Sequence, residues 1–510
     1  MTTSTRLTCL KHIGGGVTAA WFGKCALAGL LLLAVGSSSG AEAPLDIASR
    51  RELLVDRYLI DRLDGVRLKL HEPRDEGEVL RYDQPWEGPY CAYNTVIHDG
   101  ELYRLYYRGK VLNARDGVGE VTCYAESKDG QHWTKPKLGL FEAAGTRENN
   151  IVLTTPGVTH NFSPFLDARP GVSPAERFKA LGGVKEKNQP ESGLFAYASG
   201  DGIHWHLLQP GAVITRGAFD SQNVAFWSAA EQRYICCLRI FAPGPAQPGK
   251  KPPSLRTVAR TTSADFIHWT EPEPMRFEPA QEVNLYTTQT HPYFRAPHLL
   301  IATAARFMPG RQALTEAEAR QIQAGAAYFK DASDAVLLTS RDGRTYQQTF
   351  REALIRPDLR PNSWVSRTGY PALNVVPTGP QEMSLFVNQD YTQPTAHLRR
   401  YALRLDGFAS VNAPYEGGEF VTKPLRFAGR KLQLNFATSA AGSVRVEIQD
   451  AAGKPLPGFA AADCREILGN RIEWPVAWKG GGDVGALAGQ AVRLRFVMKD
   501  ADVFALQFAP

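Results

Sequence analysis

Cysteine is scarce in this 510-residue chain, and the few cysteines lack the spacing of a metal site. The seven cysteines include no CxxC pair, which argues against structural zinc. Two of them fall within the first 43 residues, so an odd number remains, and we expect mostly buried free thiols with at most one incidental disulfide. Adjacent Cys236 and Cys237 should point to opposite faces of a strand.

Clustered positive charge is also missing. The chain has 58 Lys and Arg against 52 Asp and Glu, a net charge of +6, and its arginines are scattered rather than gathered in runs. Because nucleic-acid binding needs a basic stripe or patch, the sequence predicts no nucleic-acid partner.

Long hydrophobic runs are absent except near the N-terminus. Three basic residues accompany the apolar run 25–35, and small residues follow at 37–43. This order is typical of an export signal, although an anchor that stays attached is the competing interpretation, and the apolar run is short for a mature membrane helix. We therefore expect a signal peptide over 1–43, no stable membrane insertion after its cleavage, and a secreted or periplasmic protein.

A short motif recurs along the chain and predicts the fold. It reads SKDGQHW at 127–133, SGDGIHW at 199–205, SADFIHW at 263–269 and, more weakly, SRDGRTY at 340–346, with a degenerate LDGF at 405–408. Asp and Gly tolerate the positive φ of a tight turn, and the aromatic residue begins the outgoing strand, so each copy predicts a hairpin. Copies at a regular interval indicate a repeated supersecondary unit.

Each copy closes a segment with the pattern of a four-stranded meander. Five such repeats predict a five-bladed β-propeller over 44–411, in which radial repetition protects the strand edges. One helix is expected inside it, at 315–326, as an insertion between the second and third strands of blade four. Short strands with Gly-rich turns and no motif follow, and they predict a C-terminal β-sandwich over 412–510, so the fold class is all-β.

Candidate site residues follow from the geometry of a propeller, whose ligands bind on the central axis. In each blade, the start of the first strand lies beside the end of the second. Three second strands end in arginine, in blades one, three and four, near acidic residues. The predicted substrate-binding residues are Arg108, Arg239, Arg306, Asn94, Asn161, Gln222, Asn223, Tyr286, Trp364 and Arg367.

Glycoside hydrolysis fits this combination because it needs two carboxylic groups that flank the scissile bond. We predict Asp220 and Glu282 as the acid/base pair, with Glu87 as a third acidic group. Aromatic rings stack on sugars, and arginines bind carboxylate or sulfate groups through paired hydrogen bonds.

Each candidate also has a structural interpretation. Asp220 and Glu282 could cap turns, Glu87 could be a solvated loop residue, and the arginines could form ion pairs between blades. The aspartates of the repeated motif are predicted to be structural, because they lie in outer hairpins far from the axis.

The segment WEGPYCAYNTVIHDGELYRLYYRG at 86–109, together with the repeated turns and the terminal strands, resembles the five-bladed propeller glycoside hydrolases of families 32, 43 and 130. Family 32 carries catalytic acids in Trp-x-Asn-Asp-Pro, Arg-Asp-Pro and Glu-Cys motifs, and none of these is present here. The resemblance therefore implies the architecture of a divergent member, while the catalytic assignments rest on position alone.

The resulting hypothesis is an exported glycosidase that cleaves a polysaccharide or oligosaccharide, and the arginines favour an acidic or sulfated one. No cofactor and no metal ligand set is expected. The alternatives are a non-catalytic carbohydrate-binding propeller and a glycoside phosphorylase whose arginines bind phosphate.

Overall fold

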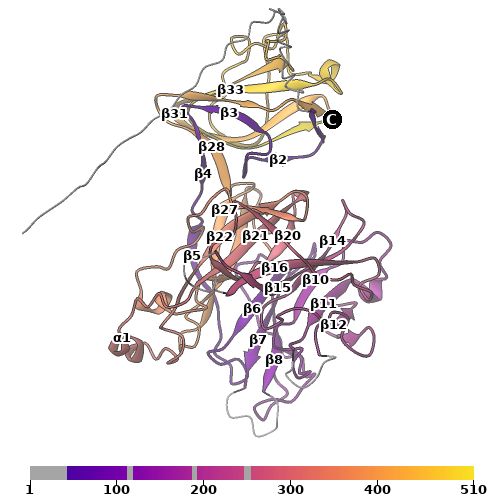
Figure 1. The fold of residues 1–510 in the computed structure, drawn as a ribbon, viewed down its shortest axis with the longest axis vertical. Helices are drawn as coiled ribbons and strands as arrows, with labels where there is room; N and C mark the ends of the chain where they lie inside the picture. The colour runs from indigo at the N-terminus through magenta and orange to yellow at the C-terminus, as the bar shows by residue number, and fades with distance from the viewer. Residues whose placement is uncertain (1–42, 112–118, 186–191, 246–253) are drawn as a thin grey trace, which may run out of the picture. The chain divides into compact units, whose positions relative to one another are not determined.

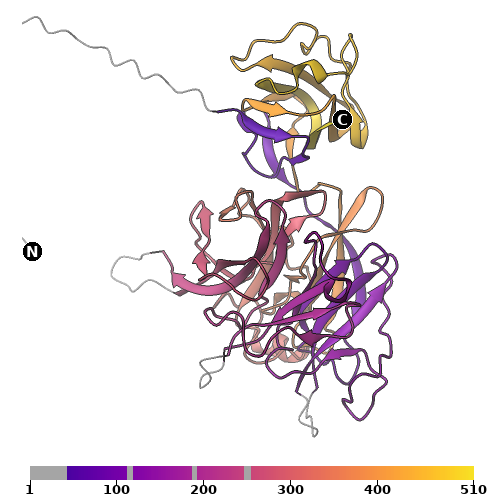
Figure 2. The same ribbon diagram turned by 90° about the vertical axis from the view of Figure 1, so that its right-hand side faces the viewer.

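The structure is a computed structural model that describes residues 43–111, 119–185, 192–245 and 254–510 (Figures 1 and 2). Five of its sheets are the blades of a propeller, so the predicted all-β, five-bladed architecture is confirmed. Neighbouring blades touch through their first strands, which therefore surround the axis. Residues 1–42 of the predicted signal peptide lie outside the described residues. Within the described ranges, no helix is long and apolar enough to cross a membrane.

The first three blades are four-stranded antiparallel meanders. Blade one contains β6 (Ala92–His98), β7 (Tyr103–Lys110), β8 (Glu120–Ser127) and β9 (Ile151–Leu153). Blade two contains β10 (Ser163–Leu166), β11 (Phe178–Gly182), β12 (Phe195–Ser199) and β13 (His206–Leu207). Blade three contains β14 (Val224–Ser228), β15 (Arg233–Pro243), β16 (Ser254–Ser263) and β17 (Glu273–Pro274).

Blade four is larger because an extra strand, β18, pairs in parallel with its outer edge. It contains β18 (Arg276–Glu278), β19 (Asn284–Thr287), β20 (Thr290–Tyr293), β21 (Ala296–Met308), β22 (Ala332–Ser340) and β23 (Thr345–Gln347). The predicted insertion contains α1 (Glu316–Gln321), a helix shorter than expected, whose N-terminus is closed by a capping box between Thr315 and Glu318.

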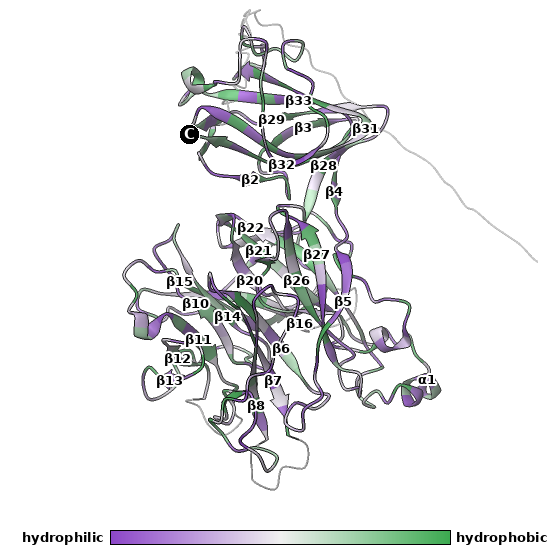
Figure 3. Cartoon of the chain, turned by 180° about the vertical axis from the view of Figure 1, so that it is seen from behind, coloured by the Kyte–Doolittle hydropathy of each residue, from purple (hydrophilic) through white to green (hydrophobic). Residues whose placement is uncertain are grey.

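Blade five differs from the prediction at its outer edge. It contains β24 (Tyr370–Pro371), β25 (Val376–Pro377), β26 (Glu382–Gln389), β27 (His397–Arg404) and, as its outermost strand, β5 (Arg74–Arg81). The degenerate turn at 405–408 therefore closes no outer hairpin. Its Asp406 is buried and accepts a hydrogen bond from the Tyr293 hydroxyl at 2.8 Å, and the chain continues into the C-terminal sheet. Figure 3 shows β5 in the colour of hydrophilic residues, as suits an edge strand.

The repeated motif has one geometry in all four clear copies. In the first, Asp129 Oδ1 accepts from the backbone N–H groups of Gln131 and His132 at 2.8 and 2.9 Å, and the Ser127 hydroxyl also donates to it. Asp201, Asp265 and Asp342 accept the same backbone pair. The prediction that these aspartates are structural agrees with these bonds.

The aromatic residue after each turn packs against the preceding blade. Trp133 meets Phe386 of blade five edge-on at 5.7 Å, and Trp205 meets Tyr106 of blade one at 6.0 Å. The motif therefore also joins neighbouring blades. Successive side chains of a strand point to opposite faces of its blade, so each strand contributes to the packing on both sides. Cys236 packs in the cluster between blades two and three, whereas Cys237 packs in the cluster between blades three and four. All five described cysteines are free and buried, as expected.

The remaining sheet has ten strands. They are β1 (Leu45–Ala48), β2 (Glu52–Leu53), β3 (Ile60–Asp64), β4 (Arg67–Leu70), β28 (Ala409–Ala413), β29 (Gly418–Thr422), β30 (Leu425–Phe427), β31 (Lys431–Asp450), β32 (Asn470–Pro475) and β33 (Val492–Ala509). The strands at 45–70 pair with this sheet, so the predicted propeller start at residue 44 is wrong. An apolar core that includes Trp478 and Phe496 lies within it, and the sandwich assignment stays a prediction.

Candidate functional site

Side chains from all five blades meet in one closed circuit of contacts, which we call the axial ring. Its members come from the start of a first strand, the end of a second strand or the loop beside one of them. They are Tyr93, Arg108, His160, Asp220, Arg239, Tyr286, Arg367 and Tyr391.

The first half of the axial ring crosses blades one to three. The Arg108 guanidinium lies over the Tyr93 ring at 4.9 Å, and the Tyr93 and His160 rings are 5.6 Å apart. His160 Nε2 lies 3.1 Å from Asp220 Oδ1, and Arg239 lies 3.7 Å from the other oxygen of the same carboxylate.

The second half crosses blades four and five and returns to blade one. The guanidinium groups of Arg239 and Arg367 each lie 5.2 Å from the centre of the Tyr286 ring. Arg367 also lies 5.7 Å from the Tyr391 ring, and the Tyr391 hydroxyl accepts a hydrogen bond from Arg108 at 3.1 Å. The circuit therefore closes without a gap.

Two members of the ring have a backbone conformation that side chains rarely adopt. Tyr93 has φ 57° and Arg367 has φ 66°. Such strain costs free energy and clusters at functional sites, where the surrounding structure holds it. It marks the axial ring as the first place to look for function.

His160 lies between two carboxylates. Its Nδ1 is 2.9 Å from Glu120 Oε2, and its Nε2 contacts Asp220. Burial and the nearby Arg108 oppose a charge on His160, but the hydrogen bonds to Asp220 and Glu120 outweigh them and raise its pKa. Burial likewise opposes ionisation of Asp220 and Glu120, yet the contact with His160 and the nearby arginines lower the pKa of both. The three side chains therefore form a hydrogen-bonded triad in which the shift of each pKa favours the charged form.

Exposure separates the roles of the two carboxylates. The Asp220 side chain is 61% exposed, whereas that of Glu120 is 26% exposed and also lies 3.9 Å from Arg108. Asp220 is accessible to a ligand, and Glu120 holds His160 from behind. Because one imidazole bridges them, the nearest oxygens of Asp220 and Glu120 are at most roughly 8 Å apart.

Positive charge gathers around a single tyrosine. Besides Arg239 and Arg367, Arg256 lies 5.7 Å from the centre of the Tyr286 ring. Across the described part of the chain, no carboxylate lies within 4 Å of the guanidinium groups of Arg256 and Arg367, and the buried Arg256 Nε has no hydrogen-bond partner there. The cluster can accept an anionic group.

Two predicted binding residues fill the axis instead of facing a ligand. The Gln222 side-chain amide donates to Thr95 Oγ1 at 2.9 Å, and that of Gln289 donates to Gln222 Oε1 at 2.6 Å. Asn94 is buried and accepts a hydrogen bond from the Tyr82 hydroxyl at 2.8 Å. The bonds of Gln222 join blades one, three and four.

Two further predicted residues brace the backbone. Asn161 is fully buried, and its side-chain amide donates to three carbonyls, among them Phe219 O at 2.6 Å. Asn223 donates to Phe219 O and Ser221 O. They shape the loop that carries Asp220 but have no free polar group for a substrate.

Glu87 does not join the site. Its side chain is fully buried in blade one, where it accepts hydrogen bonds from Lys135 Nζ at 2.8 Å and from the Tyr107 hydroxyl. Burial raises the pKa of Glu87, and the contact with Lys135 opposes the rise. In this position Glu87 is one partner of a buried ion pair, and its catalytic role stays a prediction.

Three predicted residues lie apart from the ring: Glu282 and Arg306 in blade four, and Trp364 in the segment before β24 of blade five. Glu282 is exposed and pairs with Arg351 at 3.3 Å, because the first strand of this blade begins only at Asn284. Arg306 forms a two-bond ion pair with Asp334 and lines a cavity of about 850 Å³ together with Trp364. The predicted pairing of Asp220 with Glu282 therefore has no support in the geometry.

The predicted site residues lack five that belong to the ring or contact it: Tyr93, Glu120, His160, Arg256 and Tyr391. Glu120 and Arg256 lie near the starts of third strands, a position that the search along first and second strands did not include. Across the described ranges, no group of three or more His, Cys, Asp or Glu residues is arranged to hold a metal ion.

No family model and no curated protein matches the chain. Several solved structures are similar to the chain. One is an N-acetylgalactosamine deacetylase from F. plautii in complex with blood group B trisaccharide, with 14% identity, a TM-score of 0.43, and coverage of 67% of this chain and 96% of that one. Another is named a glycoside hydrolase, with 13% identity, a TM-score of 0.43 and coverage of 65% and 92%. A putative glycoside hydrolase from Bacteroides ovatus has 12% identity, a TM-score of 0.36 and coverage of 68% and 98%.

Proposed function

We propose that this protein is an exported glycoside hydrolase-like enzyme that cleaves glycosidic bonds in an anionic polysaccharide or oligosaccharide. One observation carries the proposal: all five blades contribute to the axial ring, and the ring presents an exposed carboxylate, Asp220, beside the imidazole of His160, whose hydrogen bonds raise its pKa. Acid–base hydrolysis needs a proton donor and a proton acceptor, and His160 and Asp220 can supply them.

The proposed chemistry assigns one role to each group. His160 gives its proton to the glycosidic oxygen as the bond from that oxygen to the anomeric carbon breaks. Asp220 takes a proton from a water molecule, whose oxygen bonds to the anomeric carbon. The proton on Asp220 then returns to His160 through solvent. Glu120 is a positioning residue, because its bond to Nδ1 orients the imidazole and stabilises its charge.

The preference for an anionic sugar rests on the charge of the site. Arg108, Arg239, Arg256 and Arg367, with His160, supply more positive charge than Asp220 and Glu120 offset. Guanidinium groups bind carboxylate and sulfate groups through paired hydrogen bonds, and the tyrosine rings offer flat surfaces for a sugar. The substrate class is therefore uronic acid-containing or sulfated.

A carbohydrate-binding propeller without catalysis is the second candidate. The observation that favours it is that both carboxylates already accept hydrogen bonds from one imidazole. Phosphorolysis is the third, since the arginines would also suit phosphate. Hydrolysis differs from both of these candidates because it alone gives turnover in the absence of phosphate.

The deciding experiment measures reducing-end release from a panel of uronic acid-containing, sulfated and neutral polysaccharides, with and without phosphate. Wild-type protein should act on an anionic member, and Asp220→Asn should lower kcat by about 10²–10⁴-fold. Glu282→Gln is the matched control, because it removes an exposed carboxylate outside the ring. Near-normal turnover by Asp220→Asn would remove the assignment, and binding without turnover by the wild type would favour the second candidate.

A further inference from the structure

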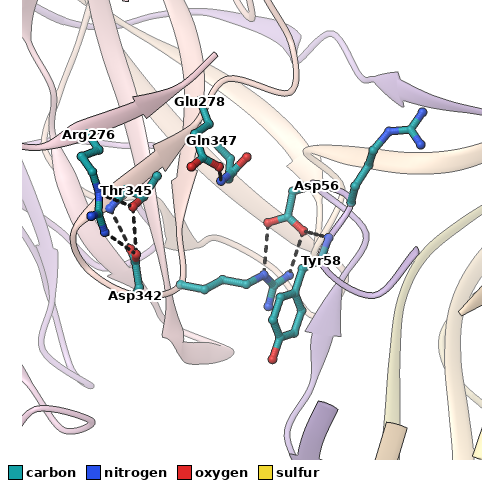
Figure 4. A pocket seen from close by; sticks show the side chains of 9 residues that line it. Asp56, Tyr58, Arg276, Glu278, Asp342, Thr345 and Gln347 are labelled. Atoms are coloured by element: carbon teal, nitrogen blue, oxygen red, sulfur yellow. Dashed lines mark hydrogen bonds and ion pairs between the residues drawn. The ribbon is translucent and has the colours of Figure 1, made fainter. Parts of the chain in front are cut away.

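A second polar cavity lies at the outer edge of blade four (Figure 4). Its volume is about 510 Å³, within the range of roughly 300–1,000 Å³ that holds small ligands. One wall comes from residues 56–58, between β2 and β3, and the other from β18, β23 and the turn before β23. None of the residues named above as site candidates lines it.

The first wall is held rigidly. Arg341 donates to Asp56 Oδ2 and to Leu53 O, both at 3.1 Å, and also pairs with Glu52. Its guanidinium lies 4.2 Å from the centre of the Tyr58 ring, which lines the cavity. These contacts fix the position of an aromatic surface before any ligand arrives, which lowers the entropic cost of binding.

The second wall presents polar groups in fixed positions. Gln347 donates to one oxygen of Glu278 at 2.8 Å, and Arg276 donates to Thr345 Oγ1 at 3.3 Å. In the part of the chain that the structure describes, neither the second Glu278 oxygen nor the Tyr58 hydroxyl has a hydrogen-bond partner. Acceptors and donors therefore remain available on both sides of the cavity, as Figure 4 shows.

The charges that line the cavity balance. Three carboxylates stand against three guanidinium groups: Asp56, Glu278 and Asp342 with Arg57, Arg276 and Arg341. No net charge attracts an ion. A sugar suits such a cavity. Each of its hydroxyl groups both donates and accepts hydrogen bonds, and the sugar ring stacks on an aromatic side chain.

We propose that this blade-four cavity is an accessory binding site for a neutral saccharide. The ligand class rests on the proposed function, since the cavity would hold neutral sugar residues of the carbohydrate whose anionic residues bind at the axial ring. Binding at two sites raises the effective concentration of a polymer at the axial ring without any new catalytic group. Short substrates cannot use both sites, so the accessory site affects polymers alone.

The test is native affinity electrophoresis of the full chain in gels that contain dextran, mannan or arabinan, with heparin as the anionic comparison. We expect retardation by at least one neutral polymer and about tenfold weaker retardation for Tyr58→Ala. Gln347→Ala, which leaves the aromatic wall intact, should also weaken it. Tyr415→Ala is the matched control, because it removes another exposed tyrosine outside the cavity.

The outcomes separate this site from the axial ring. Asp220→Asn should be retarded like the wild type, and Tyr58→Ala should keep normal turnover of a short oligosaccharide. If retardation depends on Tyr58 but the protein has no hydrolytic activity, the proposed function is wrong and the accessory site is still supported. No retardation by any neutral polymer, retardation by heparin alone, or retardation that both variants keep would overturn the site.

Discussion

Removing Lys135 is the sharpest test of whether Glu87 is structural. The Glu87 side chain is fully buried, and Lys135 Nζ is its ion-pair partner at 2.8 Å, with further hydrogen bonds from Gln84 N and the Tyr107 hydroxyl. Lys135→Met would leave a buried carboxylate without its cation. Breaking a buried pair from one side costs about 3–5 kcal/mol, so the free energy of unfolding should fall by that amount at neutral pH.

The loss of unfolding free energy in Lys135→Met should depend on pH in a defined direction. Burial already raises the pKa of Glu87 above its ordinary value, and without Lys135 the opposing effect disappears. A raised folded-state pKa means that protonation stabilises the fold. That stabilisation is complete below the unfolded pKa and is lost as pH rises through the folded pKa. The difference between Lys135→Met and wild type should therefore shrink as the pH falls from about 7 to about 5.

Urea unfolding followed by tryptophan fluorescence measures the effect, and buried Trp86 lies next to Glu87 in the chain. The double variant Lys135→Met/Glu87→Gln should recover most of the stability, because no buried charge remains. Glu87→Gln alone should keep near-normal turnover. If Glu87→Gln folds normally but loses activity by orders of magnitude, Glu87 takes part in the chemistry and the structural interpretation is wrong.

Three other predictions concern the ring and the packing of blade one. kcat/KM should fall as pH rises through the folded-state pKa of His160, which lies above its ordinary value, and a pH–rate profile of His160→Gln should lack this alkaline limb. Arg256→Ala should raise KM for an anionic substrate about tenfold and leave a neutral one unchanged, and equal losses on both would contradict the anion assignment. Gly109→Ala would place a Cβ 2.6 Å from Trp86 O, so thermal unfolding should show a loss of about 1–3 kcal/mol; an unchanged midpoint would show that blade one yields easily.

Local chemistry made most of the propeller predictable. The Asp-Gly turns are determined by residues within one hairpin, so four blades could be counted from the sequence alone. The outer strand of blade five could not, because β5 pairs with β27 across a sequence separation of more than 300 residues. The pairing of 45–70 with the C-terminal strands was missed for the same reason.

The site residues were predictable where the position of a residue within its blade decides whether its side chain reaches the axial ring. Arg108 and Arg239 end equivalent strands, and both reach the axial ring. Arg306 ends the corresponding strand of blade four but meets Asp334 instead. The burial of Glu87 beside Lys135 could not be predicted, because no spacing rule measures burial.

The closure of blade five by β5 sets the order in which the chain can fold. Asp75 pairs with Arg399, 324 residues later, and Gln507 donates to Ser49 O across 458 residues. The N-terminal strands β1 to β5 therefore have no strand partners until almost the whole chain has been synthesised. Loop closure over such distances is slow, and an unpaired β5 is an open edge that invites aggregation. A chain shortened at its C-terminus would lose partners at both ends, whereas a circular permutant that begins after β5 would place β5 after β27 in the chain, with the strands of the ten-stranded sheet between them.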